Sequence, residues 1–287
     1  MPTPIDTPFE KYHGLGNDFL VVQARRLPRS LSDLARAMLS RHTGVGADGL
    51  VLVLPPRGKK HDARLRFFNQ DGSEAEMSGN GIRCAGACLM SRKGKKPVLE
   101  LETVAGLKSV ERIETGEGRW VLRVGMGAPI LEPAKIPFRA EGVTAPVVGF
   151  LLRTQRGVLP VTVTSMGNPH CTVFVSEFAG IDWSNLGREI ERSELFPRGV
   201  NVEFAKVISR EEVEVRFWER GVGHTSSSGT GSCAAVVAGI LNGYNDRHVR
   251  VRTEAGVLEV AWPESGEISL SGPVEAVFRG TYSYRGH

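Results

Sequence analysis

The sequence predicts an α+β protein of two pseudo-symmetric halves, each a mostly antiparallel sheet wrapped around a central helix. The main observation is a repeated stretch. Arg66-Phe67-Phe68 leads to the turn Ser78-Gly79-Asn80-Gly81, and Arg216-Phe217-Trp218 leads over the same distance to Ser228-Gly229-Thr230-Gly231. Both copies predict a strand, a loop and a serine that opens a helix. Short strand-like segments separated by glycine, proline or charged residues dominate the remainder of the chain.

The elements follow in order from local composition. In the first half, apolar and β-branched runs predict strands over 20–22, 49–53, 64–68, 98–103 and 120–124. In the second half, similar runs predict strands over 161–165, 171–175, 200–204 and 213–218, followed by a strand-rich tail over 249–260 and 268–284. Helical spacing predicts a helix over 31–41 after Ser30, and one helix after each repeated turn, over 81–92 and 231–242.

The repeat also predicts the domain organisation. We expect an N-terminal half over residues 1–126 and a C-terminal half over 127–274, with a glycine-rich crossover at 125–129. The last strand, over 275–287, can return to the first half. A weaker similarity, between Gly16-Asn17-Asp18 and Gly167-Asn168-Pro169, supports a pseudo-twofold arrangement of the two halves. Two similar halves that end strands in the same turn predict one site in a cleft between them.

Composition excludes several functional classes. With 287 residues, 41% hydrophobic and 24% charged, the chain has the make-up of an ordinary globular protein. The net charge of +4 is small, and no aromatic residue interleaves the one basic cluster, at 92–96, so we expect no nucleic acid partner. The sequence shows neither a signal peptide nor a run long enough to span a bilayer, so a cytoplasmic location without membrane contact is expected.

The cysteines predict neither a metal site nor disulfides. Cys84 and Cys88 lie four apart on a predicted helix, and no further His or Cys pair completes a metal-binding set with them, Cys171 or Cys233. Buried, reduced thiols are the better explanation.

The two turns predict anion binding. A Ser-Gly-x-Gly turn before a helix leaves backbone N–H groups without helical partners, and the helix dipole adds positive potential, so each turn suits a carboxylate. Polar residues stand before both turns, and the repeat places Asn69 and Glu219 at equivalent positions. Glu219 suits an ammonium group and Arg220 a carboxylate, which together indicate an amino acid or diamino acid as substrate.

Seven motifs in order, correctly spaced, resemble the diaminopimelate epimerase family over nearly the whole chain. They are Lys11-Tyr12-His13-Gly14-Leu15-Gly16-Asn17-Asp18-Phe19, Arg41-His42-Thr43-Gly44-Val45-Gly46-Ala47-Asp48-Gly49, Asn69-Gln70-Asp71-Gly72-Ser73, Gly79-Asn80-Gly81-Ile82-Arg83-Cys84, Met166-Gly167-Asn168-Pro169-His170-Cys171, Asn201-Val202-Glu203-Phe204 and Glu219-Arg220-Gly221-Val222-Gly223.

The resemblance implies an amino acid isomerase of the lysine and cell-wall pathway that works without cofactor or metal, and a homodimer is the family expectation. In that family two cysteines on opposite faces of the substrate α-carbon move the proton. The resemblance further implies substrate contacts from side chains and from backbone groups at the turns: Asn17, Asn69, Asn168, Asn201, Glu219, Arg220, and Gly79, Asn80, Gly229, Thr230.

The chain departs from the family pattern at the two reacting positions, where Ser78 and Ser228 stand in place of the cysteines. A serine hydroxyl is not ionised at neutral pH and needs an adjacent base. His224, where the family usually has glutamate, is either a surface loop histidine or such a base for Ser228. Three explanations stay open: a natural relative with altered chemistry, an epimerase with both cysteines replaced deliberately, or an amino acid-binding protein without turnover.

Overall fold

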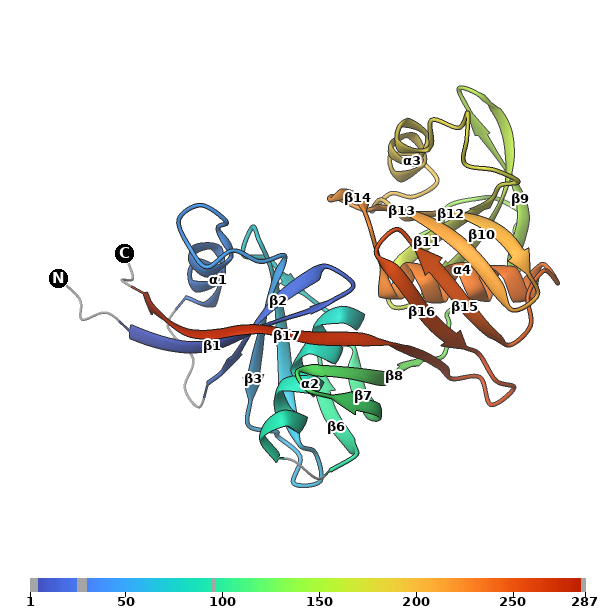
Figure 1. The fold of residues 1–287 in the computed structure, drawn as a ribbon. Coiled ribbons are helices and arrows are strands. Elements are labelled where there is room, and N and C mark those ends of the chain that lie inside the picture. Colours follow the sequence, from blue (N-terminus) through green and yellow to red (C-terminus); the bar gives the residue numbers. More distant parts are fainter. Residues whose placement is uncertain (1–4, 25–29, 94–95, 285–287) are drawn as a thin grey trace. The chain divides into compact units, whose positions relative to one another are not determined.

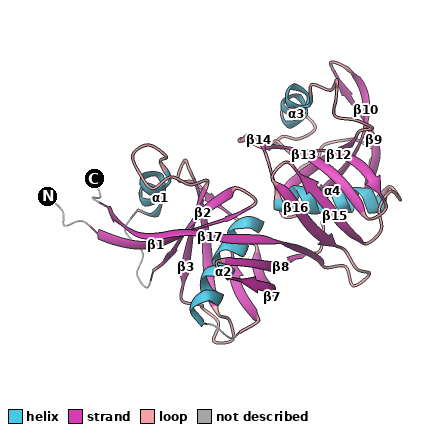
Figure 2. Cartoon of the chain, in the orientation of Figure 1, coloured by secondary structure: helices cyan, strands magenta, loops and turns pink. Residues whose placement is uncertain are grey.

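The computed structural model describes residues 5–24, 30–93 and 96–284. The chain forms two compact units, one of Met1–Gly125 with Ser271–His287 and the other of Met126–Leu270. Residues 94 and 95 of the basic cluster, and 1–4 at the N-terminus, lie outside the described part. Figure 1 shows the course of the chain, and Figure 2 shows that strands outnumber helices in both units.

The first unit is a closed ring of eight strands around helix α2 (Figure 1). Its elements are β1 (Ile5–Gly14), β2 (Asn17–Gln23), α1 (Leu31–Leu39), β3 (Gly49–Leu54), β4 (Ala63–Asn69), β5 (Glu74–Ala75), α2 (Gly79–Lys93), β6 (Val98–Thr103), β7 (Gly106–Gly116), β8 (Arg119–Gly127) and β17 (Ile268–Tyr284). The ring runs β1–β2–β3–β4–β6–β7–β8–β17 and returns to β1. Every residue from 79 to 90 is buried, because strands surround α2 on several sides.

The second unit packs a row of paired strands around helix α4. Its elements are β9 (Val147–Thr154), β10 (Gly157–Ser165), β11 (Pro169–Phe174), α3 (Trp183–Glu191), β12 (Asn201–Ser209), β13 (Glu212–Glu219), β14 (Gly223–Thr225), α4 (Gly229–Leu241), β15 (His248–Thr253) and β16 (Gly256–Ala261). The strands pair in the order β9–β10–β11–β12–β13–β15–β16. Helix α4 carries no charged residue and contacts β10 to β13, β15 and β16.

The two units repeat one pattern of pairing, which confirms the predicted pseudo-symmetric α+β fold. The pairs β1–β2, β3–β4 and β6–β7 are antiparallel, and so are β10–β11, β12–β13 and β15–β16. The pairs β2–β3 and β4–β6 are parallel, as are β11–β12 and β13–β15. Each unit is therefore mostly antiparallel, and its parallel pairs flank a helix that crosses from one strand to the next.

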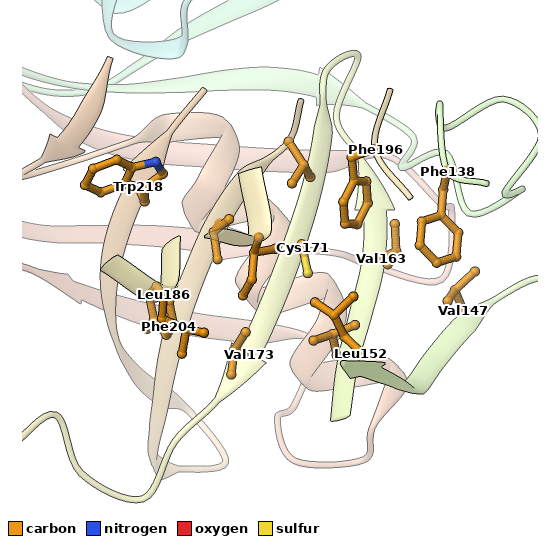
Figure 3. Packing of buried hydrophobic residues seen from close by; sticks show 14 of the residues in the cluster. Phe138, Val147, Leu152, Val163, Cys171, Val173, Leu186, Phe196, Phe204 and Trp218 are labelled. Atoms are coloured by element: carbon orange, nitrogen blue, oxygen red, sulfur yellow. The ribbon is translucent and has the colours of Figure 1, made fainter. Parts of the chain in front are cut away.

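A second helix in each unit covers the face of the sheet that the central helix leaves open. Helix α1 places Leu34 and Met38 against Leu20, Leu50 and Phe68. In the second unit, Leu186 and Ile190 of α3 pack with Phe204 and Trp218, as Figure 3 shows for the labelled side chains. Phe68 and Trp218 hold equivalent places in the repeat, so the two cores are built alike.

Element bounds differ from the sequence prediction in a few places. The helices after the turns begin at Gly79 and Gly229, directly after the serines, and the first helix ends at Leu39. The prediction missed α3 and the strands β1, β5, β7, β9 and β14. Asp182 caps α3 by accepting a hydrogen bond from the backbone N–H of Asn185 at 3.3 Å, a start signal that the sequence carried. None of the helices in the described part of the chain is long and apolar enough to cross a membrane.

Candidate functional site

The two serines occupy the same structural position in the two units. Ser228 is the N-cap of α4, and its Oγ accepts a hydrogen bond from the backbone N–H of Gly231 at 3.2 Å. Ser78 precedes α2, and its Oγ accepts from the N–H of Gly81 at 3.1 Å. Each serine thus satisfies one of the N–H groups at the start of its helix. Ser228 is 5% exposed, whereas Ser78 is half-buried.

The second glycine of each turn is required by an aromatic ring. A Cβ on Gly81 would lie 3.1 Å from the ring of Phe67, and a Cβ on Gly231 would lie 2.8 Å from the ring of Phe217. The helix therefore starts against the strand that precedes it, and the turn is held close to that strand. This close packing explains why the aromatic strand and the glycine turn recur together in the sequence.

In the first unit, two predicted site residues lie beside the Ser78 turn. Asn80 donates through Nδ2 to Oδ1 of Asn17 at 2.8 Å, and Asn17 donates through Nδ2 to Oδ2 of Asp48 at 3.0 Å. Arg83, fully buried in α2, donates to Oδ1 of Asn80. Asn69 is exposed at the end of β4, and its Nδ2 donates to Oγ of Ser73 at 3.0 Å.

A charged network fixes the strand end that carries Asn17. Asp18 pairs with Lys11 at 2.7 Å and accepts from the backbone N–H of Asp48 at 2.8 Å. Arg41 bridges to Asp48 at 2.7 Å. Burial acts to raise the pKa of Asp18, but the hydrogen bond and charge of Lys11, the backbone of Asp48 and the charge of Arg41 outweigh it and hold that pKa below its ordinary value.

The second unit presents an equivalent arrangement. Asn168 donates through Nδ2 to Oγ1 of Thr230 at 3.4 Å, in the place of the Asn17–Asn80 contact. Asn201 is 6% exposed; it donates to the carbonyl of Pro169 at 2.9 Å and accepts from the backbone N–H of Arg220 at 3.1 Å. Asn201 therefore ties together the ends of β11, β12 and β13, on which the site residues of this unit stand.

The two charged candidates lie at the end of β13. The guanidinium of Arg220 donates to the carbonyl of Arg198 at 3.2 Å. Glu219 is the last residue of β13 and is half-buried. Within each unit the structure therefore brings the predicted residues to the strand ends beside the helix start.

The hydrogen bond of His224 in the described structure is to Glu254 and not to the serine hydroxyl that it was considered to serve. Its Nε2 is 2.5 Å from Oε2 of Glu254, and its ring packs edge-on against Trp183 with centroids 5.0 Å apart. The side chain is 44% exposed. These contacts favour a surface histidine, which lies in the short strand β14 and not in a loop as expected.

All four cysteines lie in the described residues; they are buried and form no disulfide. Burial raises the pKa of Cys84 to about 12 and also raises the pKa of Cys171, so neither supplies a thiolate at neutral pH. No group of three or more His, Cys, Asp and Glu side chains in residues 5–24, 30–93 and 96–284 is arranged to hold a metal ion.

A buried pair that the sequence prediction did not place in the site is His170 with Glu203. Their Nδ1 and Oε1 atoms are 2.7 Å apart, and both side chains are at most 1% exposed. Nε2 of His170 is 2.9 Å from Oδ1 of Asn168. A glutamate inside the apolar start of a strand, Asn201–Ser209, was the available signal, because such residues are almost never fully buried unless paired.

Comparison with solved structures defines the class of fold. A hydroxyproline epimerase from Agrobacterium vitis aligns with a TM-score of 0.73 at 16% identity, covering 99% of this chain and 93% of that one. A methylitaconate-delta-isomerase aligns with a TM-score of 0.66 at 16% identity over the full length of both chains. At these identities the likeness shows the fold alone.

Sequence comparison gives the family. The diaminopimelate epimerase family matches residues 9–132 and 162–277. Proteins named diaminopimelate epimerase from Pelotomaculum thermopropionicum and Desulforudis audaxviator are each 48% identical, over 282 and 279 residues, and cover 96% of this chain and 99% and 98% of their own. The chain therefore belongs to the diaminopimelate epimerase family.

Proposed function

We propose that this chain is a cofactor-independent amino acid epimerase that converts L,L-diaminopimelate to the meso form. The observation that carries the proposal is the pair of equivalent helix starts, each with a hydroxyl at the N-cap and an asparagine contact beside it, in a chain of this family. The proposal also places the protein in the cytoplasm, in lysine and cell-wall biosynthesis, as a possible homodimer.

The proposed reaction requires two groups that act on one α-carbon. A base removes the α-proton from one face, the electron pair is left on the α-carbon and its carboxylate, and an acid on the other face returns a proton. Backbone N–H groups at Gly79, Asn80, Gly229 and Thr230 suit the α-carboxylate, whose charge grows as the proton leaves. Ser78 and Ser228 occupy the proton-transfer positions, so the proposal requires both turns to reach the same substrate.

The remaining contacts are assigned by charge and hydrogen-bonding capacity. Glu219 accepts from a substrate ammonium group, and Arg220 donates to the second carboxylate. Four asparagine side chains can both donate and accept hydrogen bonds, which suits a diamino acid whose ends each carry an ammonium and a carboxylate group. They are Asn17, Asn69, Asn168 and Asn201.

A second candidate function is amino acid binding with little or no turnover. It is favoured by the surroundings of the serines: in the described part of the chain, no carboxylate or imidazole is hydrogen-bonded to Oγ of Ser78 or of Ser228. A neutral hydroxyl without a base is a poor proton acceptor, whereas a cysteine is a few per cent thiolate at neutral pH. We therefore expect the native rate to be low and to rise when the serines are replaced by cysteine.

The test is deuterium uptake at the α-carbon of L,L-diaminopimelate in D₂O, read by mass spectrometry, with chiral separation of the product. The native chain is compared with Ser78→Cys, Ser228→Cys and the double variant. The two-group mechanism predicts that one single variant exchanges the L-centre without inverting it, whereas the double variant exchanges and inverts. Ser226→Cys adds a thiol at an exposed neighbouring position and serves as the control.

The outcomes separate the two candidates. Label and inversion with the native chain support the epimerase directly. Deuterium uptake by the double variant alone supports an amino acid-binding protein that retains the pocket without its acid–base pair. If the double variant neither exchanges nor binds L,L-diaminopimelate in calorimetry, the proposed substrate is wrong.

A further inference from the structure

We propose that Glu203 is a positioning residue, which fixes the amide of Asn168 through the buried ring of His170. The inference rests on the proposed function, because Asn168 is assigned there to the substrate. It concerns residues of the second unit only. Glu203 Oε1 lies close to the Ser228 turn, since a Cβ on Gly231 would be 3.0 Å from it. The effect proposed here reaches the ligand through two intervening side chains, those of His170 and Asn168.

The first step is a continuous chain of hydrogen bonds. Glu203 Oε1 lies 2.7 Å from His170 Nδ1, and His170 Nε2 lies 2.9 Å from Asn168 Oδ1. Asn168 continues the chain by donating to Thr230 at the Ser228 turn, at 3.4 Å. The chain thus runs from the interior of β12, across β11, to the start of α4.

The second step is a count of hydrogens. An amide oxygen only accepts, so the hydrogen between His170 and Asn168 belongs to Nε2 of the ring. The short contact to Glu203 then needs one more hydrogen, either on Nδ1 as an imidazolium facing a carboxylate or on a neutral carboxyl group facing Nδ1. In either form both ring nitrogens are hydrogen-bonded. The two hydrogen bonds fix the orientation of the ring, and the ring in turn fixes the orientation of the Asn168 amide.

The third step comes from the internal repeat. Asn17-Asp18-Phe19 is equivalent to Asn168-Pro169-His170, so Phe19 stands in the first unit where His170 stands in the second. Phe19 faces Gly49 in the parallel pair β2–β3, as His170 faces Asn201 in β11–β12. Two residues further along, the counterpart of Glu203 is Val51, and both Phe19 and Val51 are buried.

The repeat therefore shows that this fold does not need the buried pair. The first unit forms the same strands with a phenylalanine and a valine at these positions. Burying an ionisable pair brings a desolvation penalty that well-packed apolar residues avoid, so such pairs are weak stabilisers. A role in the site accounts for the His–Glu pair, because His170 at the start of β11 holds Asn168. The equivalent Asn17 is held by Asp48 and Asn80 instead.

The hydrogen count also makes the contact dependent on pH. Burial, opposed chiefly by the charge and hydrogen bond of His170, raises the pKa of Glu203 to about 7. The neighbouring titratable groups are Glu219 on β13 and Cys171 on β11, while α4 adds only Cys233 and β10 none. Loss of the shared hydrogen at higher pH leaves two acceptors face to face, and the hold on Asn168 then weakens.

The test compares Glu203→Gln with the double variant His170→Phe, Glu203→Val. The glutamine amide can donate to Nδ1 at any pH and keeps the ring in place. The double variant copies the first unit and is expected to fold, which near-ultraviolet circular dichroism checks. Glu177→Gln is the control, since it makes the same change at an exposed glutamate that pairs with Lys206.

The first measurement needs no ligand. Nitrogen-15 spectra of the side-chain amides should show a sharp, single Asn168 NH₂ pair in the native chain and in Glu203→Gln. In the double variant the two NH₂ signals of Asn168 should broaden, and their chemical shifts should move toward those of a free amide. An Asn168 signal that is unchanged in the double variant overturns the proposal, whatever the protein binds.

The second measurement is calorimetric binding of L,L-diaminopimelate between about pH 6 and 9. Losing one organised hydrogen bond should weaken binding about five- to tenfold in the double variant. The native affinity should fall toward high pH, and Glu203→Gln should remove that dependence. Equal affinities in all variants overturn the proposal. If the native chain does not bind L,L-diaminopimelate but the Asn168 signal is displaced in the double variant, the proposed substrate is wrong and the positioning of Asn168 stands.

Discussion

Replacing Ser228 by alanine tests whether the serine at the start of α4 stabilises the fold as a helix cap. Its hydroxyl accepts from the N–H of Gly231 at 3.2 Å and is 5% exposed, so water cannot easily replace it. Alanine leaves that N–H without a partner inside the protein. This perturbation is separate from proton transfer, because it concerns the stability of the empty protein.

The magnitude follows from the cap geometry. Loss of a serine N-cap destabilises a helix by about 1 kcal/mol, whereas glycine at the same position loses only a few tenths of that. For a unit of this size, about 1 kcal/mol lowers the melting temperature by about 2–4 °C. Sulfur is a weak acceptor, so Ser228→Cys should fall between alanine and serine.

The assay is urea unfolding followed by tryptophan fluorescence. Trp183, Trp218 and Trp262 belong to the second unit and Trp120 to the first, so the signal reports mainly on the unit that contains Ser228. Ser226→Ala, at an exposed position two residues earlier, should stay within about 0.5 kcal/mol of the native chain. If Ser228→Ala is as stable as that control, the hydroxyl does not act as a cap and the reasoning fails.

Three further predictions concern the described fold. Gly44→Ala should lower the free energy of unfolding, measured in urea, by about 3 kcal/mol, because the new Cβ would lie 2.1 Å from the carbonyl oxygen of Ala37. The control is Gly116→Ala, whose new Cβ would have its nearest atom at 3.8 Å and should leave the free energy of unfolding almost unchanged. Equal effects of the two substitutions would contradict the packing argument. Hydrogen bonds from the backbone of Gly58, from His61 and from the backbone of Arg57 hold the pKa of Glu102 at about 2. The resulting stability is present above about pH 4.5 and disappears as pH falls toward 2, so Glu102→Gln should flatten the change in urea midpoint between about pH 5 and 3. Iodoacetamide at about pH 7.5 should label Ser78→Cys and spare the native cysteines, since all four are buried; a labelled native chain in mass spectrometry would refute this.

The repeat made the fold predictable from the sequence. Two strands of like composition that each end in a Ser-Gly-x-Gly turn fixed the place of both central helices, and the helices begin at the glycine after each serine. Helix α3 was missed because its apolar residues are few and its cap, Asp182, lies in a segment of mixed character. Its stability comes from packing against Phe204 and Trp218, which a local pattern does not reveal.

The site was predictable in part. The residues beside the helix starts, such as Asn17 and Asn168, could be identified because they belong to motifs close to the turns. The His170–Glu203 pair was missed because its partners come from different strands, and only the parallel register of β11 and β12 brings them together. The role of His224 was open in the sequence for the same reason, since its partner Glu254 follows a later strand.

The division of the first unit between both ends of the chain has a consequence for synthesis. The second unit is one continuous stretch, Met126–Leu270, and can complete its contacts as soon as that stretch has left the ribosome. The ring of the first unit stays open until β17, which follows the second unit in the chain, inserts between β1 and β8. Until then β1 and β8 are edge strands, each with one side unpaired, and such edges can pair wrongly with other chains.

A circular permutant would make the first unit continuous as well. Ile5 lies opposite Tyr284 in the β1–β17 pair, so a short linker can join residues 5 and 284. A new start at Met126 would then make each unit a single uninterrupted stretch. Each unit could then be expressed by itself, and β1 would be made directly after β17, so these two strands could pair early.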